Sequence, residues 1–185
     1  MDIKVLKDQI WTTRVSRINA ERRLITKEKF IQGLNIYYSC VTIIFSILSL
    51  INGNNNLSLI TTFMSICLLV TILYLNAERY MDHARDYRRN YTALHKLEMQ
   101  LDNPSITLDE IAEIRLEYCD LLDSAWNHTP YDYYCTVFQS SGDYRDKRWK
   151  NKVPAGFYWG KFWRAVVMTL LIILPAVVYY LCGVI

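Results

Sequence analysis

Charge is missing from three long stretches of this chain, residues 34–51, 57–77 and 165–185, although charged residues are frequent elsewhere. At 1.5 Å rise per residue, each stretch makes a helix roughly 27–32 Å long, about the hydrocarbon thickness of a bilayer. A buried helix of a soluble protein normally keeps a polar face, which the third stretch lacks. A hydrophobic hairpin inside a soluble domain is the alternative. The pattern favours three membrane-spanning helices.

Motifs for catalysis and for cofactor binding are also missing. The chain has only six glycines and shows no Gly-rich phosphate loop, no HExxH and no GxSxG motif. Its five cysteines and three histidines do not have the spacing of metal ligands. We therefore expect no cofactor, no metal site and no enzymatic activity. A pair formed by His128 and Asp132, acting on lipid headgroups, is the enzymatic alternative; a loop histidine bonded to the chain after a helix end is the simpler interpretation.

The distribution of basic residues predicts the topology of an all-α membrane protein. The uncharged turn at 52–56 is too short for anything but antiparallel neighbours. Lysine and arginine are abundant in 1–32 and in 78–164 but absent from this turn, which places the N-terminus in the cytoplasm and the C-terminus outside. We expect a cytoplasmic amphipathic helix at 1–32, a transmembrane hairpin at 33–77 that is continuous with a cytoplasmic helical region at 78–144, a basic juxtamembrane loop at 145–161 and a third transmembrane helix at 162–185.

The N-terminal segment contains no proline or glycine from Lys4 to Gln32, which predicts one helix that continues into the first span. Its mixed charges favour packing in a helical bundle over lying on a membrane surface. An imperfect apolar stripe and an opposite charged face are expected; the stripe holds Leu6, Ile10, Val15, Ile18 and Ile25, and the charged face holds Arg14, Arg17, Glu21, Arg22 and Lys29.

The second span is expected to run on as a helix whose aromatic residues form a heptad-like seam. Tyr80, Tyr87 and Tyr91 are its candidate contacts, either with the N-terminal helix of the same chain or with a second copy. Pro104 ends this helix, and a capping box from Thr107 to Glu110 begins the next one. Residues 131–154 are expected to form a loop. Its basic cluster at 147–152 favours anionic lipid headgroups, with RNA or a nucleotide as the weaker alternative.

Polar residues also form a stripe inside the first span. They recur at alternating spacings of four and three, so that they share one helix face. Small hydroxyl residues in a membrane either allow close helix packing or line an aqueous path, and both roles remain open. The candidate pore-lining or packing residues are Asn35, Ser39, Thr42, Ser46 and Ser49.

Several of these segments together resemble the SLATT domain, a two-transmembrane effector domain of bacterial conflict systems. The basic helix at 17–24 precedes a two-span hairpin, a helix continues through Tyr87 and Tyr91, and the segment 127–133 is similar to that family's post-helix motif. The resemblance covers roughly residues 9–144. The third span is extra to a minimal two-span domain and suggests a subgroup linked with reverse transcriptases.

The resemblance implies a defence effector of the bacterial inner membrane that forms homo-oligomers and compromises the membrane on an upstream signal. A reverse transcriptase, its nucleic-acid product or a nucleotide second messenger would supply that signal. A membrane-tethered adaptor for a cytoplasmic partner is the alternative function. The candidate signal-coupling residues lie in the post-helix motif and are Asn127, His128, Asp132 and Tyr133.

Overall fold

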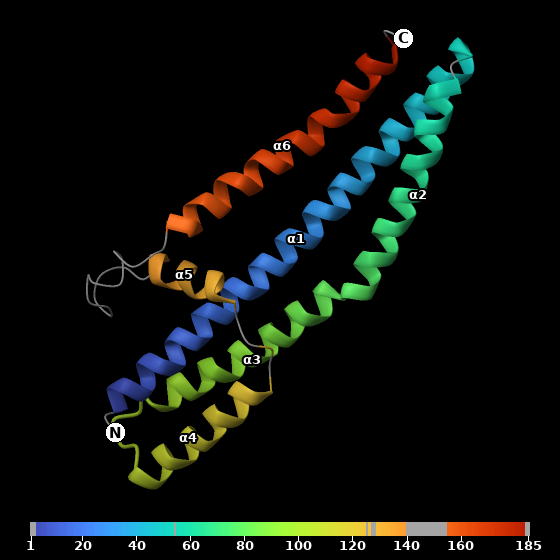
Figure 1. Ribbon diagram of the computed structural model, residues 1–185. Helices are drawn as coiled ribbons and strands as arrows, with labels where there is room; N and C mark the ends of the chain where they lie inside the picture. Colours follow the sequence, from blue (N-terminus) through green and yellow to red (C-terminus); the bar gives the residue numbers. More distant parts are fainter. Residues whose placement is uncertain (1–2, 54, 125, 127–128, 140–154, 184–185) are drawn as a thin grey trace. The chain divides into compact units, whose positions relative to one another are not determined.

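The computed structural model describes residues 3–53, 55–124, 126, 129–139 and 155–183, and the regular structure in this part of the chain is helical. The helices are α1 (Ile3–Asn52), α2 (Asn55–Glu78), α3 (Tyr80–Gln100), α4 (Leu108–Asp123), α5 (Pro130–Gln139) and α6 (Ala155–Gly183) (Figure 1). The chain divides into two compact units. The charged unit comprises Met1–Thr26 and Tyr80–Phe157, and the apolar unit comprises Lys27–Arg79 and Tyr158–Ile185, so that α1 contributes residues to both.

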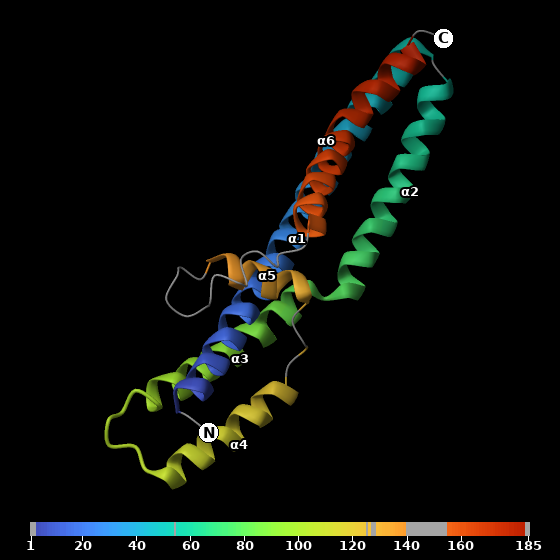
Figure 2. The ribbon, with the colours of Figure 1, turned by 60° about the vertical axis from the view of Figure 1, so that its left-hand side comes forward.

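The apolar unit contains the hydrophobic parts of three helices. Helical segments Ile3–Asn52, Asn55–Gln100 and Tyr158–Leu181 are each long and apolar enough to cross a membrane. The predicted all-α membrane fold is confirmed. The hairpin turn forms where expected: α1 ends at Asn52, Gly53 adopts a φ of 64°, and α2 begins at Asn55. Glycine takes this left-handed conformation at no steric cost. Figures 1 and 2 both show α2 running alongside the second half of α1.

The predicted continuous helix from the second span into the following segment is interrupted at one residue. Helix α2 ends at Glu78, Arg79 has a φ of 47°, and α3 begins at Tyr80. A left-handed residue breaks the regular helical hydrogen bonding and is unfavourable for a side chain with a Cβ atom. Ala77, Glu78 and Arg79 are all good helix formers, so local propensity carried no signal for this break.

Three helices of the charged unit share one hydrophobic core. Leu6 and Ile10 of α1 are almost fully buried against the end of α3 and one face of α4. This confirms that the N-terminal helix packs within a bundle of its own chain. The remaining buried members of the core are Leu94, Leu97, Leu101, Ile111, Ile114 and Tyr118.

The buried face of α1 beyond Ile10 differs from the predicted stripe. Val15, Ile18 and Ile25 are only half-buried, whereas Arg17 and Glu21, expected on the exposed charged face, are buried. The buried positions keep the three- and four-residue spacing of a helix face, but apart from Ala20 and Leu24 their side chains are polar. The prediction assumed an apolar partner surface, and the surface that α1 meets offers hydrogen-bonding groups instead. The buried polar residues of this face are Thr13, Ser16, Arg17, Asn19 and Glu21.

The predicted capping box at the start of α4 is confirmed. The Thr107 hydroxyl accepts a hydrogen bond from the Glu110 backbone N–H at 3.3 Å, and the Glu110 carboxylate accepts one from the Thr107 backbone N–H at 2.7 Å. Helix starts leave such N–H groups without helical partners, and the reciprocal pair satisfies two of them. Hydrogen bonds from Thr107 to the carboxylate lower the pKa of Glu110 below its ordinary value.

This cap makes a testable contribution to α4. We expect Thr107→Ala to lower the stability of the helix start by about 1 kcal/mol, measured as faster hydrogen exchange of the first α4 amides. Because the folded-state pKa of Glu110 is lowered, its stabilising effect is present at neutral pH and is lost as the pH falls through that pKa. Glu110→Gln should remove the pH dependence, and Glu117→Gln on the exposed face of α4 should keep it.

The predicted loop at 131–154 was wrong for its first part. Residues Pro130–Gln139 form helix α5, and residues 140–154, with the basic cluster at 147–152, lie outside the described part of the chain. Thr129 donates from its hydroxyl to Asp132 at 2.7 Å and from its backbone N–H at 3.0 Å. Proline fits the first helical position, where its missing N–H is not needed. The Thr-Pro-x-Asp pattern was therefore a helix start that the tyrosine-rich sequence obscured.

Candidate functional site

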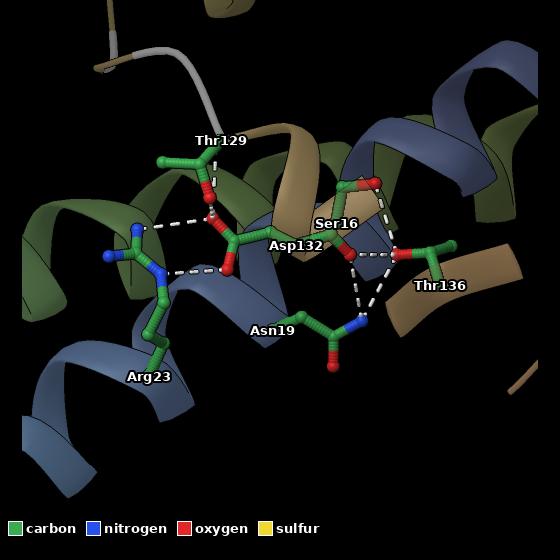
Figure 3. A network of polar contacts seen from close by, with 6 residues as sticks. All are labelled: Ser16, Asn19, Arg23, Thr129, Asp132 and Thr136. Atoms are coloured by element: carbon green, nitrogen blue, oxygen red, sulfur yellow. Dashed lines mark hydrogen bonds and ion pairs between the residues drawn. The ribbon is translucent and has the colours of Figure 1, made fainter. Parts of the chain in front are cut away.

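Asp132 of α5 is the centre of a polar contact with α1, and its side chain is fully buried (Figure 3). The Arg23 guanidinium donates to both carboxylate oxygens, from Nε at 2.9 Å and from Nη2 at 3.1 Å. Thr129 donates to the same carboxylate from its hydroxyl and its backbone N–H. A bidentate arginine and two further donors satisfy the buried charge. The Asp132 carboxylate therefore anchors α5 to α1, and the groups that donate hydrogen bonds to it belong to this chain.

A second set of neutral polar groups continues the contact one turn further along α5. The Thr136 hydroxyl accepts from the Asn19 amide at 3.0 Å, donates to the Asp132 carbonyl at 3.1 Å and lies 3.1 Å from the Ser16 hydroxyl (Figure 3). Ser16 and Thr136 are fully buried. Hydrogen bonds with partners at fixed positions specify one register between two helices more narrowly than apolar contacts do.

Arg17 lies on the neighbouring stretch of α1 and binds the C-terminal end of α4. Its side chain is 1% exposed and donates to the Leu121 carbonyl at 2.9 Å, to the Leu122 carbonyl at 3.3 Å and to the Asn90 side-chain oxygen. The last carbonyls of a helix have no helical partner and carry partial negative charge, so a cation is favourable there. Burial lowers the pKa of Arg17, but a guanidinium stays charged.

Two ion pairs join the same helix to α3. Arg14 lies 2.9 Å from the Glu98 carboxylate, and Arg88 lies 2.7 Å from Glu21. The hydrogen bond and charge of Glu21 raise the pKa of Arg88, whereas desolvation and then the hydrogen bond with Glu21 raise the pKa of Tyr91. Helix α1 is therefore tied to α3, α4 and α5 by polar contacts; we call this set the α1 polar interface.

The predicted seam residues lie within the charged unit rather than on its surface. Tyr80 and Tyr87 are each 5% exposed, and Tyr91 is half-buried. Burial raises the pKa of Tyr87. The burial of Tyr80 and Tyr87 favours the intramolecular alternative for these two residues, because their side chains are already covered by their own chain.

Of the predicted signal-coupling residues, Asp132 belongs to the α1 polar interface. Tyr133 is half-buried, with its ring 6.1 Å from that of Tyr134. Asn127 and His128 lie outside the described residues. The sequence interpretation missed the α1 residues that contact Asp132 and Thr136 of α5, namely Ser16, Asn19 and Arg23. Their spacings of three and four residues mark one helix face, and this was the only signal available for them.

The polar stripe of α1 lies in the apolar unit and is partly covered there. Thr42 and Ser49 are buried, and Asn35, Ser39 and Ser46 are half-buried. The Ser39 hydroxyl donates to the Asn35 carbonyl at 2.8 Å, and the Thr42 hydroxyl donates to the Tyr38 carbonyl at 2.8 Å. Such back-bonded hydroxyls present little polarity outward and allow close helix approach. The arrangement agrees with a packing role within one chain.

Helix α6 is joined to α1 at its internal proline. Pro175 has no N–H, so the Leu171 carbonyl one turn earlier lacks its helical partner. The Tyr38 hydroxyl donates to this carbonyl at 2.7 Å, and the Tyr37 hydroxyl donates to the Ile172 carbonyl at 2.9 Å. Side chains of a neighbouring helix thus satisfy the backbone groups that a proline frees inside a membrane. The third span is therefore a partner of the first span and not only an added anchor.

The described residues contain no cluster of three or more His, Cys, Asp or Glu side chains that would hold a metal ion. Among the cysteines in this part of the chain, Cys40, Cys67 and Cys119 are exposed and Cys135 is half-buried. These thiols belong to no site that we identify.

This chain joins apolar spanning helices to a charged helical unit. Residues 1–181 match the family described as SMODS and SLOG-associating 2TM effector domain family 5. The chain belongs to this family. The SLATT resemblance is thereby confirmed, and the match extends beyond the expected range of 9–144 to include the third span. No curated protein and no solved structure matches the chain. A SLATT effector domain places the protein among membrane effectors of conflict systems.

Proposed function

We propose that this SLATT protein is a membrane effector of a bacterial antiphage defence system that forms homo-oligomers and forms or gates a pore. The effector family and the three apolar helices support this proposal. The main support for the proposal is the distribution of polar residues along α1. Its first half contains the buried residues of the α1 polar interface, and its second half contains the polar stripe. Signal reception and membrane action then involve the same helix.

The proposed switch is a rearrangement of the α1 polar interface. Its hydrogen bonds join side chains at fixed positions on α1 and α5, so that a displacement of α1 against α5 exchanges one discrete set of partners for another. In this mechanism, the signal loosens contacts such as Arg23–Asp132, and the stripe from Asn35 to Ser49 repacks from contacts within one chain to contacts between copies. Hydroxyl groups released from packing would then line the pore.

The signal and the location belong to the same proposal. A reverse transcriptase, its nucleic-acid product or a nucleotide second messenger supplies the signal to the charged unit. The protein resides in the inner membrane with its N-terminus in the cytoplasm and its C-terminus outside. The basic residues of 1–32 and 78–164 support this orientation, since cytoplasmic segments carry an excess of lysine and arginine.

Leakage of dye from liposomes that contain the full chain tests the pore. We expect leakage on activation, and we expect Ser39→Leu, Thr42→Leu and Ser46→Leu together to reduce it to the level of protein-free liposomes while oligomers persist. Ile36→Leu, Ile43→Leu and Ile47→Leu form the matched control, because these side chains are exposed on the same span. Liposomes that stay sealed with activated wild-type protein would contradict the pore. Function retained on a foreign single-span anchor would instead support the adaptor.

A further inference from the structure

Helices α2 and α3 each have one stripe of covered side chains, but the two stripes do not share one register. On both helices, buried or half-buried positions recur in alternating steps of three and four residues. The stripe of α2 contains Thr61, Met64, Leu68, Thr71, Leu75 and Glu78. The stripe of α3, here called the tyrosine stripe, contains Tyr80, Ala84, Tyr87, Tyr91, Leu94 and Glu98. The step from Glu78 to Tyr80 is only two residues, and the register changes there.

A step of two residues is incompatible with one regular helix face. At about 100° per residue, it rotates the side chain by about 200°, whereas a step of three or four returns it to nearly the same face. With a helical residue at position 79, the α2 stripe would continue through Asp82, Arg85 and Arg89. These residues are charged, and the tyrosine stripe would face another direction. The left-handed Arg79, with its φ of 47°, therefore sets which face of α3 is covered.

Local energetics favour a continuous helix at this junction. The left-handed conformation is unfavourable for arginine, because the Cβ atom crowds the following carbonyl oxygen. Arg79 follows Ala77 and Glu78, which both favour helix, and residues 55–103 include no glycine or proline. Contacts made elsewhere in the fold must therefore hold the break in place.

Contacts with α1 and burial in the charged unit hold α3 in its present orientation. Arg88 donates from Nε to the buried Glu21 carboxylate at 2.7 Å. Tyr80 and Tyr87 are each 5% exposed, so that their rings contribute apolar burial. These contacts form with the tyrosine stripe turned inward. Their loss would remove the interactions that keep Arg79 left-handed.

We propose that Arg79 is a two-state switch between a broken and a continuous α2–α3 helix. In the broken form, Arg79 is left-handed and the tyrosine stripe is covered by its own chain. In the continuous form, Arg79 is helical, one helix runs from Asn55 to Gln100, and the tyrosine stripe becomes available to a second copy. Only this last step rests on the proposed homo-oligomer. A signal that releases α3 thereby selects between two discrete arrangements.

Hydrogen exchange of the full chain in detergent, read at the amides of residues 77–83, tests the switch. Glu21→Lys places a second cation against Arg88 and should release α3. The junction amides then enter regular helical hydrogen bonds, so we expect their exchange to slow about tenfold. A protein that is merely destabilised would exchange faster at these amides, so the direction of the change is diagnostic.

Further substitutions in the Glu21→Lys background separate the backbone of residue 79 from general flexibility. Arg79→Gly removes the penalty of the left-handed form and weakens the helical form. It should lower the ratio of continuous to broken chains about thirtyfold and abolish the slowing. Ala77→Gly is the matched control and should keep the slowing, because residue 77 is helical in both forms. Arg88→Glu restores an ion pair of reversed sign and should return the exchange of the wild type.

Unchanged or faster junction exchange in Glu21→Lys would overturn the switch, as would equal effects of Arg79→Gly and Ala77→Gly. Liposome leakage and native mass spectrometry of the same variants keep the proposed pore separate from the switch. Leakage by Glu21→Lys with unchanged junction exchange would contradict the switch and leave the pore. Slowed exchange in a protein that stays monomeric and leaves liposomes sealed would support the switch and contradict the homo-oligomer and its pore.

Discussion

Replacing Arg17 by methionine is expected to lower the stability of α4 by about 3 kcal/mol, or roughly a hundredfold in the exchange rates of its protected amides. The methionine fills similar space but donates no hydrogen bond. The Leu122 carbonyl and the Asn90 side-chain oxygen then lose their donor, while the Leu121 carbonyl keeps those from Asn90 and Ser124. Buried acceptors left without donors carry the full cost of their desolvation. Hydrogen exchange of the full chain in detergent measures this loss.

Arg22→Met provides the matched control, because Arg22 lies on the exposed face of the same helix. It should leave the exchange of α4 within the error of the wild type. The double variant Arg17→Met with Asn90→Leu removes donor and acceptor together and should be more stable than the sum of the single losses. Equal effects of the Arg17 and Arg22 substitutions would show that the carbonyl contacts of Arg17 contribute nothing to stability.

Replacing Asp132 by alanine is expected to release α5 from α1 at a cost of about 3 kcal/mol. The substitution removes the partner of Arg23 and also the acceptor for the two Thr129 donors that begin α5. Breaking a buried pair from one side is costly because the remaining charge stays uncompensated. Faster hydrogen exchange of α5, with α4 less affected, would be the signature.

Asp120→Ala is the control for this substitution, since Asp120 is exposed on α4. Arg23→Met should give a loss similar to that of Asp132→Ala, and the double variant should lose less than the sum, because the two groups share one interaction. If the α1 polar interface is the switch, Asp132→Ala should also alter leakage while Asp120→Ala leaves it unchanged. Strictly additive losses for Arg23 and Asp132 would contradict a functional pair.

Residue types close in sequence were enough to predict the spans and the capping box of α4. Length and freedom from charge decide whether a helix can cross a membrane, and the Thr107 capping box involves residues only three apart. The helix break at Arg79 was not predictable on this basis, because its neighbours favour a helix.

The α1 polar interface was visible only in part. Asp132 was a candidate because of its motif, but its bond to Arg23 joins residues 109 positions apart. Arg17 was assigned to an exposed face because an arginine on an amphipathic helix usually faces water. The end of α4 and Asn90 make its burial favourable, and no local pattern reveals such a partner.

That this protein is a helical membrane protein of the SLATT family could be read from its residues without a structure, since hydrophobic segments and short motifs are local properties. Two features came only from the folded chain: which polar side chains are buried, and that Tyr38 satisfies the carbonyl freed by Pro175. They were not predictable because burial and hydrogen bonding depend on partners distant in the chain. The sequence alone therefore predicted the three spans, and the structure showed which side chains join the first span to the third.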